Sequence, residues 1–153
     1  MILMIRPDDW NLPVLLHVAG AMALVASVTV AAVALIQGWR TPDPAVASTL
    51  QRFGARTLLW AALPSFVVMR AAGQWAVSRE GLENSNDAWI GIGFTVGDFG
   101  GILLLISIIV ANIGVRRSRD GGLGRLSKVA AGISVLLIVA YVVTIWAMTT
   151  KPS

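Results

Sequence analysis

The sequence AWIGIGFTVGDFGGILLLISIIVANIGV, residues 88–115, decides the fold of this protein. It is apolar almost throughout, and it exceeds the roughly 20 residues that a helix needs to cross a bilayer. A single carboxylate, Asp98, interrupts it. A charged group inside hydrocarbon is costly unless it is paired or faces water, so Asp98 predicts a polar site within a bundle of membrane helices.

The composition of the whole chain agrees with a membrane location. Of its 153 residues, 56% are hydrophobic and 13% are charged, whereas soluble domains contain about 25% charged residues. The chain has no cysteine and a single histidine, which excludes disulfides, thiolate catalysis and a metal site built from several such ligands. No nucleophile–base pair, carboxylate pair or phosphate-binding loop stands out, so we expect neither an enzyme nor a bound metal.

Apolar segments divide the chain into membrane spans. The predicted spans cover residues 11–37, 57–77, 88–115 and 126–148. We therefore predict an all-α integral membrane protein, a single domain over residues 1–153 folded as an antiparallel four-helix transmembrane bundle. Pro64 is expected to kink or loosen the second span. The second half of the loop before that span is a candidate for a short surface helix.

Basic residues predict which side of the membrane each loop faces. The loops at 38–56 and 116–126 share one side of a four-span chain, and they hold most of the arginines and lysines. The positive-inside rule then makes both loops cytoplasmic and places both termini outside, in a multi-pass protein of the plasma membrane. The tryptophans fall near the predicted span ends, as in an interfacial aromatic belt; they are Trp10, Trp39, Trp60, Trp75, Trp89 and Trp146.

A basic cluster surrounds the third loop. Its expected role is to set orientation, and its expected contact is with the headgroups of anionic lipids. It lacks the interleaved aromatic residues of a nucleic-acid-binding surface, so no nucleic acid is expected. The cluster consists of Arg116, Arg117, Arg119, Arg125 and Lys128.

Polar side chains recur at one depth in the predicted bundle. At about 1.5 Å of rise per residue, His17, Arg70 and Tyr141 lie about 10 Å below the outer surface, and Asp98 lies about 15 Å below it. Gln74 follows Arg70 by one helical turn. Small residues near polar ones suggest faces that pack against other helices and not against lipid. On the third span, the residues predicted to pack in this way are Gly93, Gly97 and Gly101.

Asp98 is predicted to pair with Arg70, because a short loop joins their spans. Either charge alone in hydrocarbon is unfavourable by about 2.5–3.5 kcal/mol on insertion scales. Two interpretations stay open. The pair is either a structural contact that fixes helix register, or part of a binding or proton-handling site. In the second case His17 exchanges protons near neutral pH and Tyr141 donates a hydrogen bond.

One stretch resembles a known family. LLHVAGAMALVAS, residues 15–27, is similar to the opening helix of small bacterial membrane proteins related to the copper-resistance CopD family. Arg70 in the second span and the segment Asp87-Ala88-Trp89 also fit, so the resemblance covers roughly residues 15–117. It implies a four-span membrane protein, in which His17 and Arg70 are the matching residues. It also implies an association with copper uptake or haem-pathway chemistry, with haem held through His17.

Three functions therefore remain open. The first is a small membrane protein whose polar site, formed by His17, Arg70 and Asp98 in the outer half of the bundle, binds or passes a small ligand, a proton or a cofactor. The second is an accessory or scaffold subunit in which Arg70 and Asp98 form a structural pair. The third is a haem- or metal-associated protein. The expected partners are the lipid bilayer and either further copies of the chain or a larger membrane complex.

Overall fold

The computed structural model describes residues 8–81, 88–118 and 125–150, which are almost entirely helical. No β-strand occurs within these ranges, so the prediction of an all-helical chain is confirmed for them. The elements in chain order are α1 (Asp8–Arg40), α2 (Pro44–Thr57), the π-helical segment η1 (Leu58–Ala62), α3 (Leu63–Glu80), α4 (Ala88–Ser118) and α5 (Arg125–Thr150).

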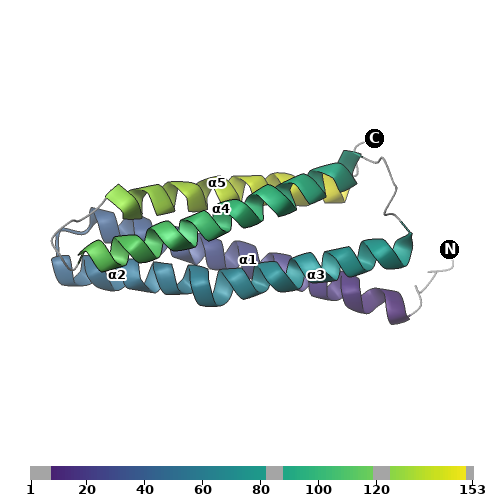
Figure 1. Ribbon diagram of the computed structural model, residues 1–153, viewed down its shortest axis with the longest axis horizontal. Coiled ribbons are helices and arrows are strands. Elements are labelled where there is room, and N and C mark those ends of the chain that lie inside the picture. The colour runs from purple at the N-terminus through teal and green to yellow at the C-terminus, as the bar shows by residue number, and fades with distance from the viewer. Residues whose placement is uncertain (1–7, 82–87, 119–124, 151–153) are drawn as a thin grey trace.

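The helices form four elongated rods that lie side by side (Figure 1). One rod is the uninterrupted series α2, η1 and α3, and the others are α1, α4 and α5. α1 packs on α2, α3 and α5, and α4 packs mainly on α5. α4 also touches α2, whereas α3 and α4 make few contacts with each other. Successive rods run in opposite directions, so the start of α1 and the end of α5 lie at the same end of the molecule (Figure 1).

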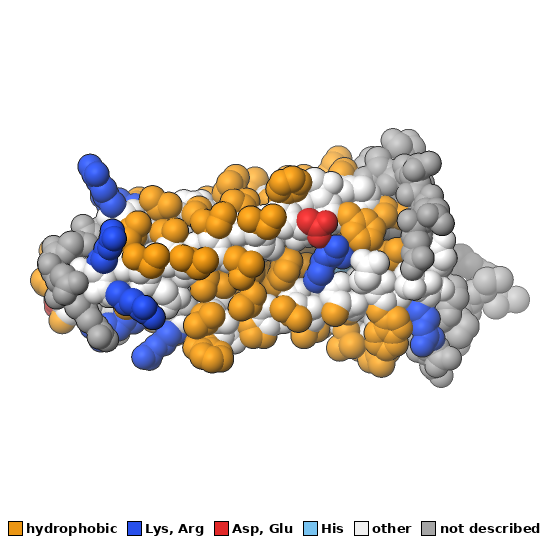
Figure 2. Space-filling model, in the orientation of Figure 1, with side chains coloured by type: hydrophobic (Ala, Val, Ile, Leu, Met, Phe, Trp, Pro, Cys, Tyr) orange, Lys and Arg blue, Asp and Glu red, His pale blue; other side chains and the backbone are white. Residues whose placement is uncertain are grey.

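Three of the helices are long and apolar enough to cross a membrane. They are Leu12–Arg40, Ile90–Arg117 and Arg125–Thr150. Their ends lie within a few residues of those of the first, third and fourth predicted spans, which supports these three predictions. Hydrophobic side chains cover the visible face of the molecule between its two ends (Figure 2). Soluble monomers rarely expose such a large apolar surface, so these helices indicate a membrane protein.

The region of the second predicted span differs from its prediction. The loop expected at 38–56 is reduced to residues 41–43, because the carboxylate of Asp43 caps α2 by accepting from the backbone N–H of Ala45 at 2.8 Å. α2 is not a separate surface helix, since its Gly54 packs so closely on Leu35 of α1 that a Cβ would approach Cγ to 2.9 Å. Among the described residues, neither α2 nor α3 reaches the length and hydropathy of a span. The segment expected to form a span at 57–77 is thus the second half of a longer rod, α2–η1–α3, that has a more polar sequence.

Pro64 explains the π-helical segment η1. A proline lacks an N–H, and its ring clashes with the carbonyl four residues earlier, here that of Trp60. The helix widens at η1, where the N–H of Leu63 donates to the carbonyl of Leu58. The predicted kink therefore takes the form of a π-bulge. Trp60 lies in this bulge, near the middle of the rod, and is 76% exposed.

Candidate functional site

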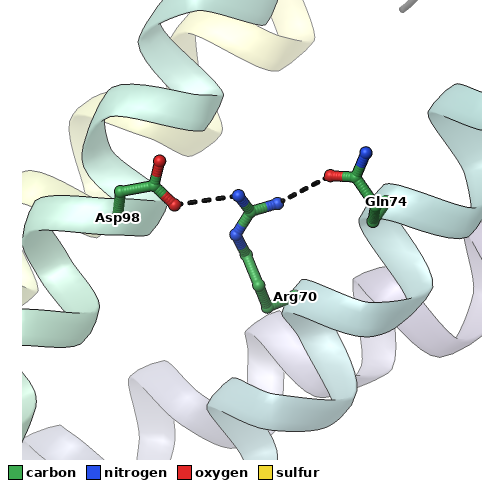
Figure 3. A network of polar contacts seen from close by, with 3 residues as sticks. All are labelled: Arg70, Gln74 and Asp98. Carbon is green, nitrogen blue, oxygen red and sulfur yellow. Dashed lines mark hydrogen bonds and ion pairs between the residues drawn. The ribbon is translucent and has the colours of Figure 1, made fainter.

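Arg70 bridges two helices that otherwise touch little. It lies on α3, and its Nη2 donates to Oδ1 of Asp98 on α4 at 2.8 Å (Figure 3). Its Nη1 donates to Oε1 of Gln74, one turn along α3, at 3.1 Å. The guanidinium also lies over the ring of Phe94 on α4, with 5.1 Å between Cζ and the ring centroid. The contact between Arg70 and Asp98 predicted from the sequence is thus present, and Arg70 has three partners.

The pair lies on the outside of the helix bundle. The side chain of Asp98 is 64% exposed and that of Arg70 is 32% exposed. The prediction that these polar residues face other helices is therefore wrong for Asp98. Neighbouring residues on a helix point about 100° apart, so Asp98 and Phe99 point outward while Gly97 and Gly100 are buried.

His17 is held in one orientation by α3. Its Nδ1 lies 2.8 Å from the backbone carbonyl of Met69. A carbonyl only accepts, so Nδ1 carries a proton, and in the neutral form of the ring the lone pair is on Nε2. A Cβ at position 73 would lie 2.7 Å from Nδ1, so the ring fits only because Gly73 has no side chain. In the part of the chain that the structure describes, no group bonds to Nε2.

A cavity of about 290 Å³ lies between α1, α3, α4 and α5. Its walls are mostly aliphatic, and they include His17, Arg70, Phe94 and Tyr141. Tyr141 is 5% exposed, and its buried hydroxyl has no hydrogen-bond partner among the described residues. The cavity lies toward the end of the molecule where α1 begins and α3 ends, since its lining includes Val14 and Val77.

The structure thus brings three of the five predicted site residues to one cavity. His17, Arg70 and Tyr141 line it, whereas Gln74 and Asp98 bind Arg70 from outside the lining. Sequence reasoning missed Phe94 and Gly73. Gly73 follows Arg70 closely on the same helix, but nothing in the sequence pairs it with His17 on α1.

The three predicted packing glycines all face neighbouring helices. A Cβ on Gly101 would lie 2.6 Å from Cζ of Phe66, and one on Gly97 would lie 3.6 Å from Cδ of Arg70, so both meet α3. Gly93 instead approaches the side chain of Met148 on α5. The stripe therefore accommodates side chains from two helices and does not bring two backbones together.

The basic residues gather at the opposite end from the cavity. Blue side chains cluster at one end of the molecule in Figure 2, where α1 and α4 end and where α2 and α5 begin. Lys128 at the start of α5 places its Nζ 5.3 Å from the ring centroid of Trp39. Arg119 of the predicted basic cluster lies outside the described residues. Within the described ranges, no group of three or more His, Asp or Glu side chains is arranged to hold a metal ion.

Gly73→Ala is expected to displace His17 and to remove its fixed tautomer. A hydrogen bond contributes about 1 kcal/mol net. This energy favours the tautomer with the proton on Nδ1 over the one with the proton on Nε2 by roughly fivefold. Because the chain has one histidine, its ¹⁵N resonances report this preference directly. Gly91→Ala is the matched control, since a Cβ there meets nothing within 4 Å. An unchanged tautomer ratio in Gly73→Ala would contradict the geometry of His17.

Comparisons with protein-family models, with curated proteins and with solved structures found no match for this chain. The resemblance to CopD-related proteins therefore stays a prediction, and the geometry of the cavity and its polar side chains carries the functional interpretation.

Proposed function

We propose that this protein is a four-span membrane protein that binds a small apolar ligand in the cavity between α1, α3, α4 and α5. The observation that carries the proposal is the cavity itself, about 290 Å³ of mostly aliphatic walls with four polar side chains, those of His17, Arg70, Tyr141 and Thr144. Binding pockets for small molecules have this composition. One water occupies about 30 Å³ of liquid, so the ligand contains on the order of ten non-hydrogen atoms.

The proposed topology makes the rod α2–η1–α3 the remaining span. Arg70 is the one charged side chain between residues 57 and 77 of this rod, and the contacts with Asp98 and Gln74 supply partners for it. The gathering of basic side chains at one end of the molecule (Figure 2) supports an orientation with that end in the cytoplasm. The cavity then lies in the outer half of the bundle.

Single cysteines test this topology, because the chain has none of its own. A membrane-impermeant maleimide is expected to label Ser78→Cys and Thr150→Cys in intact cells, and Thr41→Cys only after permeabilisation. Val28 is fully buried, so Val28→Cys should stay unlabelled throughout. Labelling at this position would show that the reagent penetrates the protein. Labelling of Ser78→Cys only after permeabilisation would show that α3 does not cross, and the reverse pattern at all sites would invert the orientation.

Butylbenzene tests the cavity as a binding site. In lipid nanodiscs, a ligand at 100 times its dissociation constant stabilises the folded state by about 2.7 kcal/mol, so we expect a clear rise in the unfolding temperature. Ala21→Phe places a ring in the cavity and should abolish this rise. Val139→Phe, on the exposed face of α5, should keep it. A rise of equal size in both variants would place the binding elsewhere.

The exposure of Asp98 favours a second function, that of a subunit in a larger assembly. A carboxylate that is 64% exposed on an apolar face faces lipid in a monomer, which is costly even when it is paired. Another protein chain would shield it. Native mass spectrometry of the gently solubilised protein distinguishes the two functions, since the subunit function requires further chains in the particle.

A further inference from the structure

We propose that the ligand of the cavity is a neutral phenol- or quinol-type molecule whose hydroxyl donates a hydrogen bond to Nε2 of His17. This inference rests on the proposed function, because it names the ligand class of the same cavity. Three features of the described residues carry it: the fixed tautomer of His17, the neutralised charges around Arg70, and the aromatic walls.

His17 requires a ligand that donates. Its Nδ1–H is committed to the carbonyl of Met69 at 2.8 Å, and Gly73 keeps that edge of the ring tight against α3. The neutral ring then presents Nε2 as an acceptor only. His17 lines the cavity and Nε2 has no partner among the described residues. A ligand that fills the cavity without a donor would leave this nitrogen buried and unpaired, which is unfavourable.

The charges around the cavity exclude ionic ligands. Arg70 is the one charged side chain that the described residues contribute to the lining, and its two terminal nitrogens already donate to Asp98 and Gln74. Phe94 covers a face of its guanidinium. An anion would have to displace these partners. Within the described part of the lining, a cation would find no carboxylate, since Asp98 points outward. The ligand that fits is therefore uncharged.

Aromatic rings form part of the wall. The imidazole of His17 and the rings of Phe94 and Tyr141 all contribute to the lining. Aromatic side chains pack favourably against another ring in offset or edge-to-face arrangements. Tyr141 adds a buried hydroxyl that lacks a partner in the described chain, and buried hydroxyls are usually bonded. The oxygen of this hydroxyl has almost no accessible surface and lies 3.4 Å from where a Cβ on Gly100 would be, so Tyr141 offers the ligand its ring and not its hydroxyl. A ring that carries one hydroxyl therefore satisfies His17.

A matched pair of probes tests the proposal. 4-Butylphenol and 4-butylanisole have the same ring and chain, but methylation removes the donor from the anisole. We expect 4-butylphenol to bind to the wild-type protein in nanodiscs about tenfold more tightly, in line with one hydrogen bond. In the ¹⁵N spectrum of the single histidine, 4-butylphenol should shift the Nε2 resonance, while 4-butylanisole should leave it unchanged.

A variant isolates the role of the acceptor. His17→Phe keeps a ring at the site but removes Nε2, so its affinity for 4-butylphenol should fall to that of 4-butylanisole. The spectrum of the wild-type protein tests the same point without a substitution, in case His17→Phe does not fold.

The results that would overturn the proposal differ from those that would overturn the cavity function. Equal affinities for the two probes and an unmoved Nε2 resonance would reject hydroxyl recognition, while a response to butylbenzene would leave the cavity function standing. A Soret band in the purified protein would assign Nε2 to haem iron and would also reject the proposal. If butylbenzene and both probes fail to bind, the proposed function itself is wrong.

Discussion

Gly20→Ala is expected to destabilise the protein by about 1–3 kcal/mol, the range seen when an extra methyl group is forced into a packed interior. A Cβ at this position would lie 2.8 Å from the backbone nitrogen of Met69 and 3.0 Å from its Cα. A backbone cannot turn aside as the end of a flexible side chain can, so α1 and α3 must move apart. The same crossing seats His17 against Gly73, so the hydrogen bond from His17 to Met69 should weaken together with the fold.

Gly132→Ala is the matched control for this change. A Cβ at position 132 meets nothing within 4 Å, and alanine favours a helix over glycine by up to about 1 kcal/mol. The control should therefore be neutral or slightly stabilising, opposite in sign to Gly20→Ala. Denaturant unfolding in mild detergent, followed by the helical circular dichroism signal, measures both. Similar changes in the free energy of unfolding for Gly20→Ala and Gly132→Ala would show that α1 and α3 are farther apart at Gly20 than in this structure.

If the pair lies in the membrane as in the proposed topology, Asp98→Asn and Arg70→Gln are each expected to lower the free energy of unfolding by about 2–3 kcal/mol, because each leaves the other charge without an ion-pair partner among lipid chains. The double variant removes both charges, so its loss should be clearly smaller than the sum of the two single losses. The difference is the coupling energy of a double-mutant cycle. The contact that it measures is the one between Nη2 and Oδ1 at 2.8 Å.

The size of this coupling also reports the surroundings of the pair. With side chains 32% and 64% exposed, the same contact in water would contribute only about 0–1 kcal/mol. Arg79→Gln is the control. Arg79 lies near the end of α3, with 5.5 Å between its Cζ and the ring centroid of Trp75, so this substitution should lower the free energy of unfolding only slightly. If the stability losses of the two single variants add up to that of the double variant, Arg70 and Asp98 do not form a pair. A coupling energy of only about 0–1 kcal/mol would argue against a location of the pair inside the membrane.

Local features of the sequence were sufficient for the helical class and for three of the spans. Hydropathy over a window of about 20 residues depends on composition alone, and it located α1, α4 and α5 to within a few residues of their observed ends. The short connection between residues 77 and 88 was enough to predict that Arg70 and Asp98 meet. Asp43 and Pro44 form a readable helix start, an N-cap followed by a proline at the first helical position. Residues 44–56 after this helix start are polar in composition. We therefore predicted mainly a loop there, although the N-cap and the proline indicate a helix.

The tertiary structure decided which faces of the helices meet, and hence the site. A one-sided apolar pattern identifies a helix that packs, but the rotation of each helix about its axis depends on all of its neighbours at once. That rotation turned Asp98 outward, although glycines beside it face inward. It seated His17 on Gly73, and it left a cavity where α3 and α4 separate. The sequence by itself determined the helices and the charged pair, whereas the packing of side chains from four rods determined the cavity, because its walls come from segments far apart in the chain.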